Sequence, residues 1–332
     1  MQLFILKFNI ICDQVLNALA TFADAIAIPD FQFPDFYDDK LHTPITKINS
    51  ELEQFKNFIR FAHLNAVSVP KHRDEIYRVL METLLDILAV CETNIKPGTP
   101  SHLYQMPGYK LIREDRTKAK GGLGVYCKSE YNPKKIAIKY EKLQPELLFI
   151  ELEINRNKVA VGVIYKSPAV SYGVYAEIQE IIAFITTKYK HVIIMGDFNI
   201  DLLKNDRPSN FFRNTILKPF SLHQVINEPT RITENTATSI DHIFVTESEN
   251  VKHSGVADFP GISDHCMIYM AYSLKRPKFK PVKIVRRDFK HFNENDFIAD
   301  MEIAPWGNIH TLGEDNNEIS IDDKVTVLEN IF

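Results

Sequence analysis

The pattern of hydrophobic positions predicts alternating strands and helices from residue 58 to residue 273. Apolar residues at helical spacing predict helices at residues 73–85, 172–189 and 209–220. Short apolar runs rich in β-branched and aromatic residues predict strands at residues 59–66, 86–92, 108–114, 122–128, 147–154, 158–165, 191–199, 239–245 and 266–272. Many paired strands with helix-covered faces indicate an α+β fold, in which two sheets stack face to face with helices outside.

One of these strands ends abruptly on a glycine and a carboxylate. Residues 192–194 are β-branched without alternation, which predicts a strand buried on both faces. Gly196 permits a sharp exit, and Asp197 and Asn199, two residues apart, project the same way. An ordinary turn is the alternative, because Gly-Asp followed by Asn is common after strands.

Polar residues at three further strand ends favour a site over a turn. Glu92 directly follows the apolar run 87–91. Asp241 opens another predicted strand, and Asp264 and His265 stand just ahead of the run 266–272. A set of oxygen ligands without a thiolate pair favours Mg²⁺ or Mn²⁺ over zinc.

Taken in order, these residues resemble the endonuclease/exonuclease/phosphatase superfamily, which includes the exonuclease III and DNase I types. Within it the chain is most similar to the endonuclease domain of LINE-type, jockey-like non-LTR retrotransposons. The resemblance covers about residues 58–273, and it implies a four-layer α/β/β/α sandwich of two packed mixed β-sheets with the site at one end of the sheets. Its motifs are Asn65 within HLNAVS (63–68), LLDILAVCETNIKP (84–97), GYKLIREDRTKAKGGLGVYCK (108–128), VGVIYKSP (161–168), GDFN (196–199), INEPTRIT (226–233), SIDHIFV (239–245) and SDH (263–265).

The resemblance implies a metal side of the site. It makes Glu92 the main ligand of Mg²⁺ or Mn²⁺, with Asn65 beside it and Asp264 as a further carboxylate. Asn65 as a plain strand end, and Glu92 as a helix-entry charge beside Thr93, are the alternatives.

The resemblance also implies a catalytic set. Asp197 would orient and deprotonate the attacking water, and Asn199 would position that water or the phosphate. His265, held by Asp241, would neutralise charge on the phosphate opposite the metal. Tyr165 resembles a tyrosine that contacts the phosphate, and simple packing of its ring at a strand end is the alternative.

The net charge of −4, from 39 basic and 43 acidic residues, is unusual for a protein that binds DNA. The distribution of the charged residues along the chain matters more than the net charge. Arg116, Lys118 and Lys120 gather in one predicted loop and are candidate DNA contacts, and a basic strip follows at residues 275–290. A solvated face or linker is the alternative for both. Thr230, a further candidate at the substrate side, either supports Asp241 through its hydroxyl or is a turn residue.

Composition adds limits on location and cofactors. Four cysteines without a CxxC pair predict free thiols in a reducing compartment. No apolar stretch reaches eighteen residues, and Asp13 interrupts the apolar start, so neither a membrane span nor a secretion signal is expected. Residues 121–124 lack the Lys-Ser/Thr of a phosphate loop, so no nucleotide cofactor is expected. The predicted location is intracellular, and nuclear if the substrate is chromosomal DNA.

Three segments follow from these patterns. Residues 1–57, with prolines at 29, 34 and 44, predict an arm and linker of unknown role, and residues 58–274 form the nuclease domain. Residues 275–332, basic and then acidic, resemble the connector before a reverse transcriptase, although no polymerase domain is visible.

The expected activity is Mg²⁺-dependent hydrolysis of DNA by an endonuclease that leaves a 3′-hydroxyl for priming reverse transcription. Val67 replaces an acid carried by some repair-type relatives, which makes abasic-site repair a weaker expectation. A phosphatase or sphingomyelinase-like phosphodiesterase of the same fold is the first alternative. A catalytically idle DNA-binding or interaction module is the second. The sequence does not predict an oligomeric state.

Overall fold

A computed structural model describes residues 39–116, 121–140, 144–233 and 235–276, with the single positions 293 and 299. The chain divides into two compact units, residues 1–278 and 279–332, and the helices and strands below belong to the first. Most of the predicted N-terminal arm and nearly all of the predicted connector lie outside the described residues.

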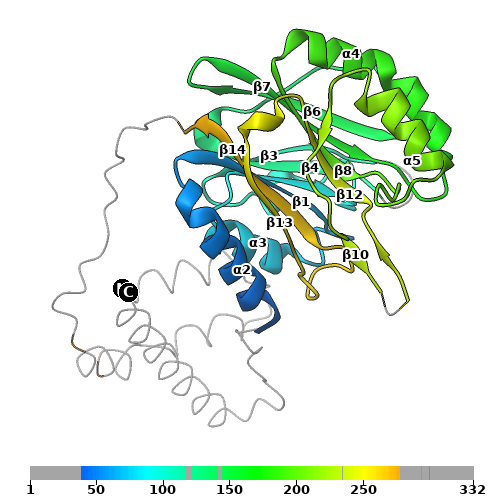
Figure 1. Ribbon diagram of the computed structural model, residues 1–332. Coiled ribbons are helices and arrows are strands. Elements are labelled where there is room, and N and C mark those ends of the chain that lie inside the picture. The colour runs from blue at the N-terminus through cyan, green and yellow to red at the C-terminus, as the bar shows by residue number, and fades with distance from the viewer. Residues whose placement is uncertain are drawn as a thin grey trace. The chain divides into compact units, whose positions relative to one another are not determined.

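Two six-stranded sheets form the frame of this unit (Figure 1). The first has the order β13 (Val251–Ala257), β14 (Met267–Lys275), β1 (Phe58–Asn65), β2 (Ile87–Cys91), β4 (Leu123–Lys128), β3 (Tyr109–Glu114). The second has the order β5 (Lys134–Lys135), β6 (Glu146–Ile154), β7 (Asn157–Tyr165), β8 (His191–Asp197), β12 (Asp241–Val245), β9 (His223–Gln224). Both are mixed, because β1 runs parallel to β2, and β7 to β8, among antiparallel neighbours. A small hairpin pairs β10 (Arg231–Ile232) with β11 (Ala237–Thr238).

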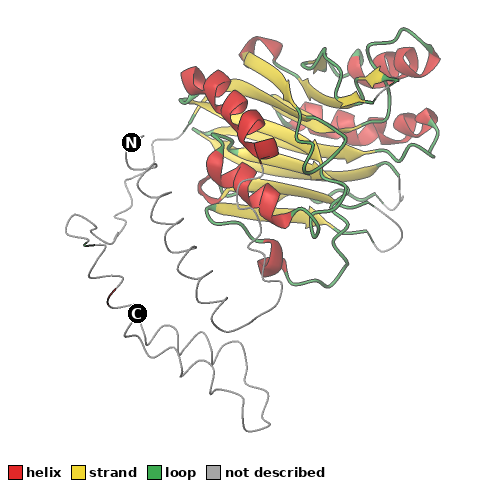
Figure 2. Cartoon of the chain, turned by 90° about the horizontal axis from the view of Figure 1, so that it is seen from below, coloured by secondary structure: helices red, strands yellow, loops and turns green. Residues whose placement is uncertain are grey.

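The sheets stack face to face between helices, as Figure 2 shows. Alternate residues such as Phe61 of β1 and Met195 of β8 meet in one apolar core between the sheets. A second core lies between the first sheet and the helices α2 (Asp39–Leu52) and α3 (Arg73–Glu82). A third lies between the second sheet and the helices α4 (Gln179–Lys188) and α5 (Arg207–Phe212). The predicted four-layer sandwich is confirmed.

Two predicted helices have mixed hydrogen-bond patterns. The helix expected at residues 172–189 begins as the 3₁₀ helix η4 (Tyr172–Ile178) and continues as α4. The helix expected at residues 209–220 is α5 followed by the π-helical turn η5 (Arg213–Leu217). Apolar spacing identifies the buried face, but over one or two turns it hardly separates the 3₁₀, α-helical and π-helical patterns. The other short helices are η1 (Glu53–Phe55), η2 (Ser101–Tyr104), η3 (Ser129–Tyr131) and η6 (Ser248–Asn250).

Helix α2 differs from the linker expected before residue 58. Its apolar residues recur at helical spacing, and all four are buried against the first sheet: Leu41, Ile45, Ile48 and Leu52. Each buried side chain contributes about 1.5–3 kcal/mol, which together offset the roughly 3 kcal/mol cost of Pro44 within the helix. The folded domain therefore begins no later than residue 39.

Strand β13 is the longest of the described strands that the pattern did not predict. It lies at the edge of the first sheet, and its sequence, VKHSGVA, carries few apolar residues. An edge strand needs only one covered face, so its hydrophobic signal is weak.

Strand β8 continues through Gly196 to Asp197, so the glycine does not start a sharp exit as expected. Its role is close approach to β7. A Cβ atom at residue 196 would lie 1.8 Å from the carbonyl oxygen of Ile164. The glycine therefore lets Asp197 end a strand that is tightly paired on both sides.

A buried ion cluster supports the first sheet at the end where β1 and β2 begin and β4 ends. Asp86 is fully buried, and its Oδ2 accepts bonds of 3.0 Å from both the backbone N–H and Nε of Arg60. Lys128 Nζ and Arg276 Nη2 each lie 3.1 Å from its Oδ1. We expect Asp86→Ala to lower the free energy of unfolding by about 3–5 kcal/mol, because Arg60 would keep a buried charge without a counter-ion.

Urea denaturation followed by circular dichroism measures this effect. The matched control is Glu53→Ala, which removes an exposed ion pair with Lys56 and should cost less than about 1 kcal/mol. Equal stability of the two variants would contradict a structural role for the Asp86 cluster.

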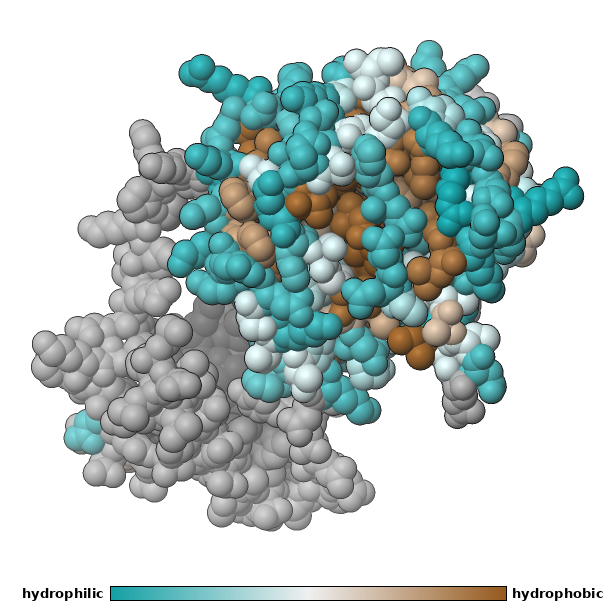
Figure 3. All heavy atoms as spheres, viewed as in Figure 1, coloured by the Kyte–Doolittle hydropathy of each residue, from teal (hydrophilic) through white to brown (hydrophobic). Residues whose placement is uncertain are grey.

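Hydrophilic side chains cover most of the face in Figure 3, and hydrophobic ones show mainly toward its middle. None of the described helices is both long enough and apolar enough to cross a membrane.

Candidate active site

The predicted site residues meet at one end of the two sheets. Asn65 ends β1, and Glu92 directly follows β2, its parallel neighbour. In the second sheet, Asp197 lies opposite Asp241 in the antiparallel register of β8 and β12. A cavity of about 530 Å³ opens here, and its walls are formed by Asn65, Val67, Glu92, Arg116, Tyr165, Ser167, Pro168, Asp197, Asn199, Arg231, Asp264 and His265.

Asp197 is almost completely buried at the floor of this cavity. Its Oδ1 accepts a bond of 3.0 Å from the backbone N–H of Asn199, and its Oδ2 accepts one of 3.0 Å from Asn65 Nδ2. Burial, and then the nearby charge of Asp241, raise the pKa of Asp197 well above the usual range of a carboxyl group. A carboxylate with a raised pKa is suited to accept a proton from water near neutral pH.

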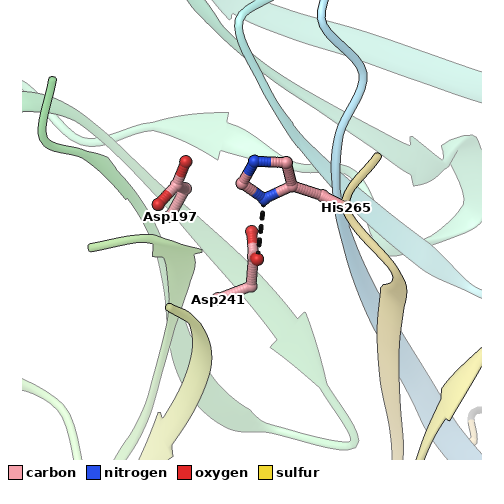
Figure 4. A group of neighbouring side chains, drawn as sticks. All are labelled: Asp197, Asp241 and His265. Atoms are coloured by element: carbon pink, nitrogen blue, oxygen red, sulfur yellow. Dashed lines mark hydrogen bonds and ion pairs between the residues drawn. The ribbon is translucent and has the colours of Figure 1, made fainter. Parts of the chain in front are cut away.

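His265 and Asp241 form a buried pair beside it. Figure 4 shows the imidazole of His265 next to both carboxylates, with Nδ1 bonded to Asp241 Oδ2 at 2.8 Å. Burial disfavours the charged imidazole, but the hydrogen bond and the charge of Asp241 outweigh this and raise the pKa of His265 to about 9. The same partner holds the pKa of Asp241 below its usual range, against the effect of burial. At neutral pH the pair is therefore an imidazolium and a carboxylate.

This pair predicts the alkaline limit of activity. If the imidazolium stabilises the reacting phosphate, the rate of phosphodiester cleavage should fall as pH rises through about 9, where His265 loses its proton. Because this pKa is raised on folding, the charged His265 also stabilises the fold fully below about pH 6.5, and that contribution is lost as pH rises through about 9.

Initial rates of cleavage between pH 7 and 10 measure this decrease in rate. The residual activity of a His265→Gln variant should lack it, and a rate for the natural protein that stays constant up to pH 10 would contradict the assignment.

Thr230 supports Asp241 and is fully buried. Its hydroxyl donates to Asp241 Oδ2 at 2.8 Å and accepts the backbone N–H groups of Ile240 and Asp241. A fully buried side chain does not reach substrate, so the structure corrects its placement among the substrate contacts and favours the supporting role.

Glu92 lines the same cavity, and one of its carboxylate oxygens accepts two hydrogen bonds. Its Oε1 accepts bonds of 3.0 Å from Asn65 Nδ2 and from the hydroxyl of Tyr165. The carboxamide oxygen of Asn65 accepts the backbone N–H of Val67, and its Nδ2 donates to both Glu92 and Asp197, so the described bonds of Asn65 fit a residue that orients these two carboxylates. Tyr165 contacts Glu92 directly. Burial, and then the charge of Glu92, raise the pKa of the Tyr165 hydroxyl, which stays protonated and donates.

Asp264 lies at the exposed rim of the cavity. Nε and Nη2 of Arg231 both bind its Oδ2, at 3.0 and 2.7 Å. Burial alone would raise the pKa of Asp264, but the bond from Arg231 lowers it. Arg231 is not among the site residues that the sequence predicted, although it directly follows Thr230 in the motif INEPTRIT. The ion pair makes Asp264 a weaker candidate ligand than Glu92.

Arg116 is the described member of the predicted basic loop, and it lines the cavity. Its Nη1 lies 2.9 Å from Oε1 of Glu146, whose Oε2 accepts the backbone N–H of Gly122. A side chain at Gly121 would collide with Glu146 and Arg116, so this glycine is needed for the pair. Lys118 and Lys120 lie outside the described residues.

Asn199 and Lys166 form the wall next to Asp197. Asn199 Nδ2 donates to the carbonyl of Lys166 at 2.9 Å, and the N–H of Lys166 donates to the carbonyl of Asp197. Lys166 is buried, and its Nζ donates to the carbonyls of Ser167 and Val170. Burial lowers the pKa of Lys166, against the charge of Asp197. Lys166 therefore fixes the loop that carries Ser167 into the cavity. The sequence alone did not reveal this role.

The carboxylate oxygens that line the cavity fit a hard divalent cation. In the described part of the chain, the cluster of three acid or histidine ligands comprises Asp197, Asp241 and His265, with atoms within 4.8 Å of one another. Asp241 and His265 already bind each other. Both oxygens of Asp197 accept hydrogen bonds, and Asp264 is paired with Arg231. Both hydrogen bonds described for Glu92 are on Oε1, so its Oε2 is the best candidate to hold a metal. Mg²⁺ and Mn²⁺ are bound through one or two carboxylates, with water and substrate phosphate completing the shell.

Comparison with known proteins agrees with this geometry. Residues 53–265 match the model of the Endonuclease/Exonuclease/phosphatase family. A search of curated protein sequences finds no match.

Three solved structures share the fold at 15% sequence identity, which is too low to show more than the fold. The 3′ phosphatase NExo from Neisseria, bound to product DNA hairpin, has a TM-score of 0.53, and 65% of this chain covers 99% of that one. The endonuclease domain of TRAS1, a telomere-specific non-LTR retrotransposon, has a TM-score of 0.52, with 66% and 100% covered. An AP endonuclease from Archaeoglobus fulgidus has a TM-score of 0.51, with 65% and 99% covered.

The matched region spans more than half of the 332 residues and contains every described site residue. The chain belongs to the Endonuclease/Exonuclease/phosphatase family.

Proposed function

We propose that this protein is a divalent-metal-dependent endonuclease that hydrolyses one strand of DNA and leaves a 3′-hydroxyl. One observation carries the proposal. A buried carboxylate with a raised pKa, Asp197, and a buried imidazolium, His265, line the same cavity as Glu92. The attack of water on a phosphodiester requires a general base, a cation near the phosphate and a ligand for the metal.

Each side chain has a defined task in this reaction. Asp197 accepts the proton of the attacking water, and the N–H of Asn199 keeps its carboxylate oriented. His265, charged and fixed by Asp241, neutralises negative charge that builds on the phosphate oxygens. Glu92 would hold Mg²⁺ or Mn²⁺, which as a Lewis acid stabilises the same charge and the departing oxygen. Tyr165 and Asn65 keep Glu92 in place.

The substrate is inferred from the resemblance to retrotransposon endonucleases and from the shared fold of TRAS1 and NExo. DNA would lie across the open end of the sheets, where Arg116 lines the cavity and Arg231 stands at its rim. Lys118 and Lys120 belong to the same basic segment of the sequence. We infer an origin in a non-LTR retrotransposon, where such a nick exposes a primer end at the target site, and action on chromosomal DNA in the nucleus.

Relaxation of supercoiled plasmid tests the activity. Nicked circles should form with Mg²⁺ or Mn²⁺, stop forming when EDTA removes the metal, and form again when Mg²⁺ is restored. A DNA polymerase should extend the nick without prior phosphatase treatment, because the product end is a 3′-hydroxyl. Raising the salt concentration should weaken cutting strongly, since binding to DNA releases counter-ions.

Assays of the same protein with other substrates distinguish the alternative functions. Release of phosphate from a 3′-phosphorylated oligonucleotide or from inositol phosphates, or release of phosphocholine from sphingomyelin, without nicking, would favour the phosphatase or sphingomyelinase-like phosphodiesterase. Binding of DNA without turnover of any of these in Mg²⁺ or Mn²⁺ would favour the idle module and contradict the proposal.

A further inference from the structure

A second histidine lies directly beneath the active site. His63 is on β1, two residues before Asn65, so both side chains point into the space between the sheets. It is completely buried, and Ala89 of β2 and Ile268 of β14 flank it in the sheet. Its Nε2 lies 3.4 Å from Oδ1 of Asp241. Neither ring nitrogen has another polar partner among the described residues.

The two oxygens of Asp241 have different surroundings. Oδ2 accepts His265 Nδ1 and the Thr230 hydroxyl, both at 2.8 Å. Oδ1 is buried, and His63 is the polar side chain next to it in the described structure. Buried carboxylate oxygens are costly without a donor, and the same holds for a buried imidazole N–H without an acceptor. The distance of 3.4 Å is longer than an ordinary hydrogen bond, but each atom is the other's available partner.

We propose that His63 is a positioning residue for the phosphodiester cleavage proposed above. Its Nε2 donates a hydrogen to Asp241 Oδ1. Asp241 then has a donor on each oxygen, so its carboxylate neither rotates nor takes a proton, and it presents Oδ2 to His265. The inference rests on the proposed function for its kinetic consequence, but the hydrogen bond itself can be tested separately.

His63 does not line the cavity. His265, at the cavity wall, binds the other oxygen of the same carboxylate. His63 thus acts through Asp241 and His265.

Three variants separate positioning from packing. His63→Phe fills similar space without a donor, and His63→Gln places a carboxamide N–H near the position of Nε2. His63→Phe should lower kcat for plasmid nicking by about 10–100-fold and leave KM unchanged, and His63→Gln should recover most of the loss. The control is His191→Phe, a buried histidine at the far end of β8 that binds Tyr272 and should keep the natural rate.

Thermal melting distinguishes the two roles further. A packing role predicts that Phe, which buries no polar atom, keeps both the melting temperature and kcat. The proposal predicts a reduced kcat together with a lower melting temperature, because Phe leaves Oδ1 of Asp241 buried without a donor. A His63→Phe variant that nicks at the natural rate would overturn the proposal.

NMR of protein with ¹⁵N-labelled histidine tests the bond without replacing His63. The signal of His63 should show hydrogen on Nε2 at neutral pH, and Asp241→Asn should shift it. Hydrogen on Nδ1 alone would overturn the proposal, even if the natural protein proves unable to nick DNA. Absence of nicking with the expected Nε2 signal would instead count against the proposed function.

Discussion

Replacing Asp197 by Asn is expected to lower the rate of plasmid nicking by about 10²–10⁴-fold. The variant keeps the size of the side chain but cannot accept the proton of the attacking water. The fold should persist, because the loss of one of two adjacent buried charges removes repulsion from Asp241. Single-turnover nicking with saturating protein measures the chemical step, and DNA binding in a gel shift should change little.

The matched control for this substitution is Asp74→Asn, which removes a carboxylate whose side chain is 90% exposed on α3. It should nick at the natural rate. Nicking by Asp197→Asn within about tenfold of the natural rate would assign the proton transfer to another group.

Replacing His265 by Gln is expected to lower the same rate by about 10²–10³-fold. Glutamine can still donate a hydrogen bond, but it carries no charge, so the variant isolates the cation that Asp241 maintains. His253→Gln is the control, because that histidine binds Glu51 at the surface next to α2. A variant at 265 that keeps the natural rate would mean that the imidazolium is structural.

Combining the two substitutions tests whether the groups act together. Asp197 and His265 line one cavity and are proposed to serve the same step. The double variant should therefore be little slower than the slower single variant. Losses that multiply would show that the two residues contribute independently.

Local sequence predicted most of the fold because buried strands leave a strong signal. The β-branched run of β8 and the helical spacing on α3 each identified an element and its covered face. The elements with weak signals were missed or misread. β13 is a polar edge strand, and Pro44 made α2 resemble a linker although its apolar face packs on the first sheet.

The sequence also identified the residue types at the site. Carboxylates, an asparagine and a histidine at successive strand ends predicted metal-dependent hydrolysis, because chain direction brings those ends to one edge of the sheets. The structure places Glu92, Asp197 and His265 along one cavity.

Several partners of the site residues were decided by the tertiary structure. Thr230, which the sequence left as either a turn residue or a support of Asp241, is buried and binds Asp241, Asp264 binds Arg231, and His63 faces Asp241 from the opposite sheet. The last two contacts join residues far apart in the chain, and the contact of His63 depends on register and on how the two sheets stack. A strand pattern gives the face of each side chain, but the group that it meets on the other sheet is fixed only when both sheets are packed.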